Sequence, residues 1–182
     1  VILRRADGTE FKVAMKSLSE PDLQFVRLQN PPWIWINMEP SVDSYTVGYF
    51  GSGGYDSTVT YEVVEPSVLL RKTSSDPYEA ALEMEMILLG RIRDIRNRYI
   101  VIESAIIPFT FTGKNSYEYR YVGFPVDLRQ IKGSWRLGIQ YEGYLILIRD
   151  SRGELVAVKG SKTALEEHAE ELSGVQFGTL LT

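Results

Sequence analysis

Residues 144–158 have the sequence YLILIRDSRGELVAV, and this stretch indicates the class of fold most clearly. Two short apolar runs, 144–148 and 154–158, lie on either side of a polar segment that contains Gly153. Short apolar runs separated by a glycine-containing turn are typical of a β-hairpin. The stretch therefore predicts two antiparallel strands, to which the other strand patterns of the chain can be related.

Several further segments have the pattern of β-strands. Residues 58–64 alternate polar and apolar side chains up to Pro66, as a half-buried strand does. Residues 33–38 and 99–111 are rich in aromatic and β-branched side chains, which favour strands. In residues 117–121 every second residue is tyrosine, which places three rings on one face of a strand.

Residues 79–93 are compatible with two structures. A capping Asp76-Pro77 start and several strong helix formers favour a helix. An alternation of apolar and acidic side chains favours a strand, with Glu83 and Glu85 facing outward. We expect the strand, because the chain on both sides supplies pairing partners; its inward face would carry Leu82, Met84, Met86 and Leu88.

The end of the chain predicts a short helix. Ser161 or Thr163 can cap it, Leu165, Ala169 and Leu172 have helical spacing, and Gly174 ends it. About seven strands with Gly and Pro turns are typical of an antiparallel sandwich or barrel. We therefore predict a mainly β protein, in which residues 31–182 form an immunoglobulin-like antiparallel β-sandwich with a C-terminal helix.

Residues 1–30 are expected to form a separate unit, a β-hairpin followed by a short helix. Asp7-Gly8 between two apolar runs favours a type I′ hairpin turn. Ser19 is placed to cap a helix, with Pro21 in its first turn and Asp22 as the acidic partner. Asn30-Pro31-Pro32 is expected to end the helix and to mark the boundary.

These N-terminal residues also resemble a known family. VILRRADG at residues 1–8, Val13, and LSEPD at residues 18–22 resemble the second half of the Sla1 homology domain 1 family. That family has an apolar strand, a basic-Ala-Asp-Gly turn, another strand, and Leu-Ser-x-x-Asp at the start of a helix. The resemblance covers roughly residues 1–28, about half of a small SH3-like barrel, and implies an accessory module that recurs in exported bacterial proteins.

A second resemblance lies around the hairpin. Residues 139–156 look like the closing hairpin of immunoglobulin-like proteins that some Gram-negative gut bacteria export. Some of those proteins have been linked to type IV pilus-like assemblies. The resemblance implies an exported protein of the periplasm or cell surface, with its signal peptide or anchor removed before Val1.

Composition excludes several classes of function. The 182 residues contain 20 Lys plus Arg against 24 Asp plus Glu, and this acidic balance argues against nucleic acid as a partner. The absence of Cys excludes disulfides, thiolate nucleophiles and iron–sulfur clusters, and no cofactor is expected. The longest apolar runs span about five residues, far short of the ~20 of a membrane-spanning helix, so we expect no transmembrane segment in this chain.

The aromatic residues form the first candidate interaction surface. Residue spacing places Trp33 and Trp35 on one sheet face, and Tyr117, Tyr119 and Tyr121 on another. Such sets serve a sandwich core, a protein interface, or a flat platform for sugars. We expect core or interface, and the sugar platform stays as the alternative.

Charged and glycine-rich segments supply the remaining candidates. Arg91, Arg93, Arg96 and Arg98 form a basic cluster that suits phosphate, a lipid headgroup or an acidic partner, or a charged sheet edge that discourages aggregation. His168 lies in an acidic stretch, for which a solvated helix face is a better interpretation than a metal site. Residues 42–57 contain four glycines and predict a strand end and a mobile loop rather than a phosphate-binding loop.

The sequence therefore predicts a non-enzymatic protein. We expect an extracytoplasmic structural or interaction component that binds other protein chains or itself, associated with a pilus-like surface assembly. The alternative is a carbohydrate-binding module that uses the aromatic faces. A hydrolase with an unrecognised carboxylate pair is a third interpretation.

Overall fold

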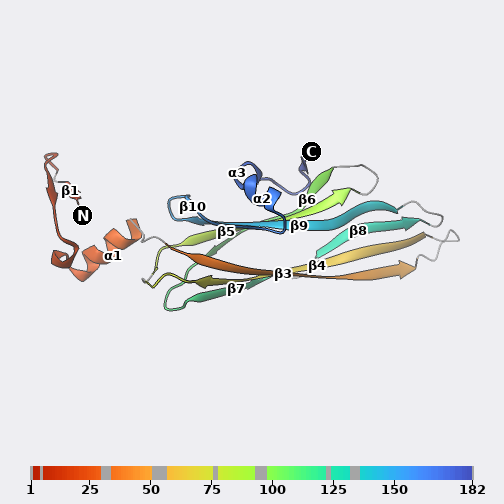
Figure 1. The fold of residues 1–182 in the computed structure, drawn as a ribbon, viewed down its shortest axis with the longest axis horizontal. Helices are drawn as coiled ribbons and strands as arrows, with labels where there is room; N and C mark the ends of the chain where they lie inside the picture. The colour runs from red at the N-terminus through yellow and green to blue at the C-terminus, as the bar shows by residue number, and fades with distance from the viewer. Residues whose placement is uncertain are drawn as a thin grey trace.

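The computed structural model describes residues 2–4, 6–29, 34–50, 57–75, 78–92, 98–121, 124–131 and 136–181. Two antiparallel sheets are stacked in a sandwich, as Figure 1 shows. The first sheet contains β3 (Ile36–Phe50), β4 (Ser57–Lys72), β7 (Ser116–Arg120) and β8 (Phe124–Ile131). The second contains β5 (Leu82–Ile92), β6 (Tyr99–Phe109), β9 (Arg136–Asp150), β10 (Leu155–Gly160) and β11 (Leu180–Leu181).

The strand order is immunoglobulin-like. β4 pairs with β8 over residues 57–64 and with β7 over residues 67–71, so β7 and β8 are two parts of one interrupted strand. With that strand counted once, the orders are β3-β4-β7/β8 and β6-β5-β9-β10. Lettered A to G along the chain, the sheets are ABE and DCFG, which differ from the constant-type immunoglobulin sheets ABED and CFG only in the position of strand D. The predicted sandwich is confirmed.

The large core lies between the two sheets. Val64, Val68 and Leu70 of β4 face Met84 and Met86 of β5 across this space, and all five are almost completely buried. The two sheets also share hydrogen bonds, because the first residues of β9 (136–138) pair with β8 and the later ones pair with β5. β9 therefore links the two layers.

The first sheet corrects two expectations about strand ends. β4 does not stop before Pro66 but continues to Lys72. Pro66 falls between the residues of β4 that pair with β8 and those that pair with β7, and its carbonyl accepts a hydrogen bond from the Tyr121 N–H at 3.0 Å. Pro66 lies where the pairing with β8 has ended and the pairing with β7 has not yet begun. The N–H that proline lacks is therefore not needed for a hydrogen bond to either strand.

β3 is the second correction. It begins at Ile36 and runs to Phe50, so the strand end that was expected within residues 42–57 extends as far as Phe50. Residues 42–50 pair with β4 along their whole length, from Val42 opposite Pro66 to Phe50 opposite Thr58. Tertiary pairing therefore overrides the glycine content of this segment. The expected loop residues 51–56 lie outside the described part of the chain.

The disputed segment 79–93 is a strand, as predicted. β5 places Leu82, Met84, Met86 and Leu88 in the large core and leaves Glu83 exposed. The expectation for Glu85 is wrong, because this side chain is only 6% exposed. The outer face of β5 is covered as well, and Ile87 and Leu89 belong to a second apolar cluster there.

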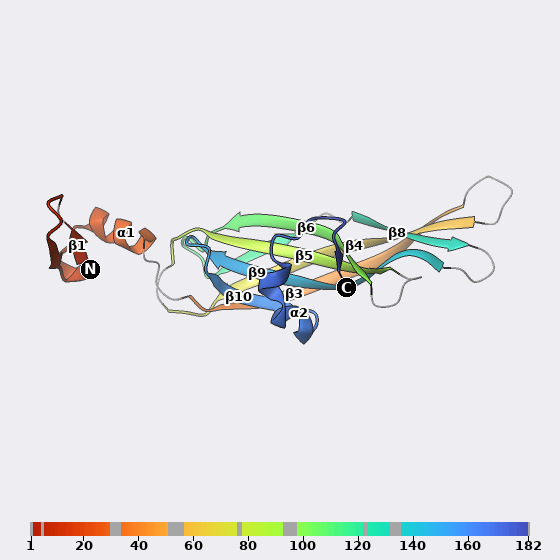
Figure 2. The ribbon, with the colours of Figure 1, turned by 90° about the horizontal axis from the view of Figure 1, so that it is seen from above.

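The C-terminal residues form the cover of this outer face. α2 (Thr163–Glu167) and α3 (Ala169–Leu172) replace the single predicted helix, with a break at His168. Figure 2 shows α2 lying over the second sheet. The segment turns at Gly174, whose φ of 75° favours glycine, and returns to pair β11 with residues 99–100 of β6.

The β9–β10 hairpin is confirmed, and its turn is organised by a buried aspartate. The Asp150 carboxylate accepts hydrogen bonds from the backbone N–H groups of Arg152 (2.9 Å) and Glu154 (3.0 Å), and from the Arg152 guanidinium. Burial raises the pKa of Asp150, but these hydrogen bonds and the Arg152 charge together hold it below its usual value.

The N-terminal unit has the predicted local structure. β1 (Ile2–Arg4) and β2 (Glu10–Lys12) form a two-stranded sheet, followed by the short 3-10 helix η1 (Met15–Ser17) and by α1 (Glu20–Gln29). Ser19 caps α1 as expected, with Leu23 N–H donating to its carbonyl. The turn is longer than predicted, because Arg4 pairs with Glu10 and residues 5–9 connect them. None of the described side chains of this unit is buried, and Figures 1 and 2 show it beyond one end of the sandwich.

Candidate functional site

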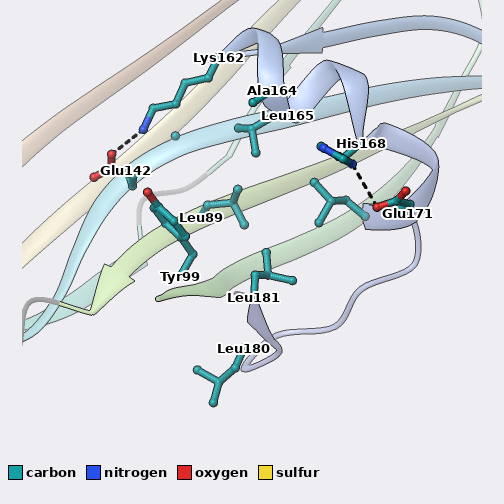
Figure 3. A pocket seen from close by; sticks show the side chains of 12 residues that line it. Leu89, Tyr99, Glu142, Lys162, Ala164, Leu165, His168, Glu171, Leu180 and Leu181 are labelled. Atoms are coloured by element: carbon teal, nitrogen blue, oxygen red, sulfur yellow. Dashed lines mark hydrogen bonds and ion pairs between the residues drawn. The ribbon is translucent and has the colours of Figure 1, made fainter. Parts of the chain in front are cut away.

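A pocket of about 580 Å³ lies between the C-terminal helices and the outer face of the second sheet. Its walls come from β5, β6, β9, α2, α3 and β11, so six elements meet here (Figure 3). The lining residues in the described part of the chain are Leu89, Tyr99, Glu142, Gly143, Lys162, Ala164, Leu165, His168, Glu171, Leu172, Leu180 and Leu181.

The base of the pocket is apolar. Leu89 is buried, and Leu165, Leu172 and Leu181 pack against the cluster to which it belongs. Leu180, at the outer wall, remains 53% exposed. An apolar concave surface with a few polar groups at its border is the usual form of a binding site.

Charged pairs border this apolar base. Lys162 Nζ lies 2.5 Å from Glu142 Oε1, and His168 Nδ1 lies 3.1 Å from Glu171 Oε2; Figure 3 shows these pairs on two sides of the pocket. The helices α2 and α3 also carry exposed or half-exposed acidic residues, and the full set is Glu166, Glu167, Glu170 and Glu171. Of these four residues only Glu171 lines the pocket, so the charged border consists of the two pairs Glu142–Lys162 and Glu171–His168.

A glycine on β9 permits the chain to pass closely over the sheet at the pocket. A Cβ atom at Gly143 would lie 2.2 Å from Ser161 Oγ, which accepts a hydrogen bond from the Tyr144 N–H at 3.1 Å. A larger residue at 143 would displace Ser161 and the start of α2. Gly143 thus fixes the height of α2 above the sheet.

Two polar contacts hold the C-terminal segment against the sheet. The buried Glu85 carboxylate accepts hydrogen bonds from Ser173 Oγ at 2.7 Å and from the Gly174 N–H at 2.6 Å. Arg149 reaches Glu170 of α3 at 2.6 Å. These contacts position α3 and therefore the wall of the pocket that α3 forms.

The structure places the predicted aromatic surface in several separate environments. Trp33 lies outside the described residues. Trp35 precedes β3 and is 63% exposed, and its carbonyl accepts hydrogen bonds from the N–H and Oγ1 of Thr73. The Trp35 backbone is therefore held in place at the start of the first sheet's edge strand, while the residue as a whole remains largely exposed.

The three tyrosines face the sandwich interior. Tyr117, Tyr119 and Tyr121 are half-buried and pack against the large core. The Tyr117 ring stacks on Phe109 with the ring centroids 4.8 Å apart, and Tyr121 OH donates to Glu103 Oε2 at 3.1 Å. Burial is the main reason that the pKa values of Tyr119 and Tyr121 are raised. These rings contribute to packing and do not make an open platform for a sugar.

Two members of the predicted arginine cluster, Arg91 and Arg98, lie among the described residues; Arg98 is exposed, and its carbonyl accepts a hydrogen bond from the Ile92 N–H at 3.1 Å. Arg91, at the end of β5, is exposed; its Nε lies 3.5 Å from Glu142 Oε2 at the border of the pocket. Arg93 and Arg96 lie outside the described residues. The structure does not bring Arg91 together with the tyrosines, because they belong to different sheets.

Other predicted candidates have ordinary environments. His168 is exposed on the break between α2 and α3, and within the described ranges no three His, Asp or Glu side chains are grouped as metal ligands. Along the same ranges, no helix is both long and apolar enough to cross a membrane.

One buried hydroxyl has no hydrogen-bond partner within the described part of the chain. Tyr78 is 3% exposed, and its OH is the atom concerned. Burial raises the pKa of Tyr78 to about 12, with a further contribution from the Asp150 charge. We expect Tyr78→Phe to keep or raise stability by up to about 1 kcal/mol at neutral pH, because it removes a buried polar atom without losing a bond.

The pH dependence checks this prediction. The tyrosine ionises near pH 10 in the unfolded chain but only near 12 in the folded one, so wild type loses stability as the pH rises from 10 to 12. The Phe variant lacks this loss, and the difference in urea midpoint should grow in its favour. A Phe variant less stable by more than about 1 kcal/mol would show that the hydroxyl does have a partner.

The pocket is the feature that the sequence pattern does not reveal. The helix residues Leu165 and Leu172 are visible as an apolar stripe, but the return of residues 175–181 to the edge of β6 is not expected from local pattern. Alternating apolar residues at Val175, Phe177 and the two final leucines are the signal that could have indicated it.

Comparison with known proteins gives little further information. No known family matches the chain, and no curated protein matches it. One similar solved structure is described as a crystal structure from Akkermansia muciniphila, with 10% sequence identity, 71% of each chain covered and a TM-score of 0.32. A likeness of this size supports no functional argument, and the Sla1 homology domain 1 resemblance of residues 1–28 stays a prediction.

Proposed function

We propose that this protein is a non-enzymatic structural component that binds other protein chains, including its own copies, in an extracytoplasmic assembly of the pilus-like type. The observation that carries the proposal is the long free edge of the first sheet. Among the described residues, β3 pairs with β4 alone, and it offers its other edge along 15 residues.

This edge is suited to accept a further strand. A strand at a sheet edge has unpaired N–H and C=O groups, with which another chain can extend the sheet. The competing edges are less open: β11 covers part of β6, which also contains Pro108, and β10 has only six residues. In β3 the described residues after Pro40 contain no second proline.

Exposed aromatic residues accompany this edge. Trp35 lies just before β3, and Tyr45 on β3 is 51% exposed. Large aromatic side chains are enriched in protein interfaces because they supply contact area at low entropic cost. They support a protein partner, whereas the inward-facing tyrosines remove most of the aromatic surface on which the carbohydrate alternative depended.

The proposal includes the organisation and location of the chain. Residues 1–30 would act as an accessory module of the Sla1 homology domain 1 type, and residues 31–182 as the immunoglobulin-like module. Export to the periplasm or cell surface is proposed from the two resemblances in the sequence. The two-stranded sheet of the N-terminal unit, separate from the sandwich strands, supports a division near residue 30.

Concentration-dependent amide exchange tests the proposed use of β3. Exchange of the β3 amides should slow by about tenfold between dilute and concentrated protein, because the added strand protects them. Ser44→Lys should abolish this protection: Ser44 is exposed but points to the same side as inward-facing Val42, so a lysine there opposes sheet extension.

The control is Ser151→Lys, the same change in the exposed β9–β10 turn, which should leave the protection intact. Exchange of β3 that is equally fast at all concentrations would contradict the use of this edge. Specific binding on a glycan array without any self-association would favour the carbohydrate-binding module instead.

A further inference from the structure

We infer that the partner of the β3 edge is β3 of a second copy, paired antiparallel about a two-fold axis that passes through Tyr45. The inference rests on the proposed function and deepens it, because it names the strand that extends the first sheet and the residues that lie opposite each other. Residues 40–50 of the two copies would pair, and the first sheets of the two copies would then continue as one across the axis.

The backbone of β3 determines which residues can bond to a new strand. Residues that lie opposite each other in an antiparallel pair either exchange both hydrogen bonds or exchange none. Pro66 lies opposite Val42, and its carbonyl bonds to Tyr121 on the far side of β4, so this pair exchanges none. The N–H and C=O groups that point to the free edge therefore belong to every second residue, namely Val42, Ser44, Thr46, Gly48 and Phe50.

The second half of β3 extends beyond β10, the edge strand of the other sheet. Through β4 and β8, Phe50 lies level with residues 136–138 of β9, whereas β10 pairs with residues 145–149 of β9. Figure 1 accordingly shows β10 at the same end of the sandwich as the start of β3. The β10 strand of another copy is a poorer partner, because it has six residues and an irregular register between Leu155 and Ala157.

The carboxylates of β3 select the register. Glu39 and Asp43 are exposed on its outer face, and β3 contains no Lys or Arg. Like charges that lie directly or diagonally opposite each other destabilise a strand pair. An axis at any of residues 38–44 places two of these carboxylates in such positions. An axis at Tyr45 places Asp43 opposite Val47 and leaves Glu39 beyond the paired residues, so it gives the longest pairing that avoids the repulsion.

Tyr45 adds a contact on the axis itself. Its side chain is 51% exposed on the outer face of β3. By the alternation along β3, its backbone groups point to β4, so it would meet its own copy at a position without mutual hydrogen bonds. Cα atoms at such positions are about 4.5 Å apart, and aromatic rings there pack against each other. Each copy would therefore cover the exposed ring of the other, and the contact closes at a dimer.

Single cysteines test the axis directly, because the chain contains no cysteine of its own. Two-fold symmetry brings a residue opposite its own copy only on the axis. Tyr45→Cys should therefore form a covalent dimer with oxidised glutathione, since Cα atoms about 4.5 Å apart fit a disulfide. Asp43→Cys is the matched control on the same exposed face. Its two copies would lie roughly 13 Å apart along the strands, so it should form at least about tenfold less covalent dimer.

Two further variants measure association without a crosslink. Tyr45→Glu places two carboxylates opposite each other on the axis and should associate at least about tenfold more weakly than wild type in sedimentation velocity. Ser41→Glu adds the same charge to another exposed residue of the outer face, which would lie opposite Tyr49, and should associate within about threefold of wild type. Circular dichroism of both variants should match wild type, since both side chains are exposed.

The outcomes separate this inference from the proposed function. If wild type remains monomeric at every concentration, both are wrong. If wild type associates and its β3 amides are protected, but Asp43→Cys crosslinks as well as Tyr45→Cys or better, the axis at Tyr45 is wrong while the use of the edge stands. A Tyr45→Glu variant that associates as strongly as wild type would overturn the inference in the same way.

Discussion

Replacing Ile87 by alanine is expected to lower the free energy of unfolding by about 2–4 kcal/mol, although Ile87 faces away from the sandwich interior. Its side chain is completely buried in the second apolar cluster, together with Leu89, Leu145 and Leu147. Truncation would leave a cavity that the surrounding strands, held by pairing on both sides of β5, cannot close. Urea unfolding of the variant and of wild type measures the loss.

Two comparisons make this result specific. Met86→Ala, on the opposite face of the same strand, should cost a similar amount, because β5 is buried on both sides. Glu83→Ala, on the exposed part of the strand, should change stability by less than about 0.5 kcal/mol. If Ile87→Ala were as mild as Glu83→Ala, the C-terminal segment would not be packed on this face.

Replacing Glu85 by alanine should detach the C-terminal segment from the sheet. The change removes the acceptor of the Ser173 hydroxyl and the Gly174 N–H in two part-buried hydrogen bonds, a loss of about 1–3 kcal/mol. The loss should appear first in residues 169–181, because Glu85 holds the middle of this segment, between the Arg149–Glu170 contact and the bonds that join residues 178–179 to Val101. Amide exchange is the measurement. The Val101 N–H donates to the Thr179 carbonyl and the Gly178 N–H donates to the Val101 carbonyl, and these two bonds join β6 to the C-terminal segment.

Faster exchange at Val101 and Gly178 with unchanged exchange in β4 is the expected pattern for Glu85→Ala. Glu85→Gln retains an acceptor oxygen of nearly the same shape and should show a smaller effect. Uniform acceleration over the whole sandwich would contradict the assignment, because it would mean that Glu85 supports the main core and not the C-terminal segment.

The sequence predicts those parts of the fold that local pattern determines. The hairpin at residues 144–158 has turn residues between two apolar runs, and the Asp150 carboxylate organises that turn through the next four residues. The capped helix after Ser19 is determined in the same local way. The prediction of a strand at residues 82–92 is correct, because the alternating apolar side chains of this segment face a core.

The remaining parts depend on contacts between distant segments. Glu85 was expected to face solvent because a carboxylate on an alternating strand usually does, and only the docking of Ser173 and Gly174 explains its burial. The four glycines of residues 42–57 predict a strand end and a loop, and pairing with β4 extends the strand as far as Phe50. The local sequence predicts that a strand ends before Pro66. In the structure the strand continues, because Pro66 lies between the residues of β4 that pair with β8 and those that pair with β7.

The candidate site was less accessible to sequence analysis for the same reason. Spacing correctly placed Tyr117, Tyr119 and Tyr121 on one face, but spacing does not determine whether that face is inside or outside. The pocket requires α2, α3 and β11 to fold back on strands far away in the chain. Two residues of its border, His168 and Glu171, belong to a charge run that, by itself, indicates a solvated helix.

Sedimentation velocity of the whole chain over a concentration series tests most directly whether this protein is an assembly component. The series should extend to about 1 mM, where a contact worth only ~4 kcal/mol is half-formed. Self-association predicts a boundary that moves faster as the concentration rises, because a larger species is in exchange with the monomer. A single monomer boundary that is unchanged over the whole series would contradict self-association and, with it, the proposed role.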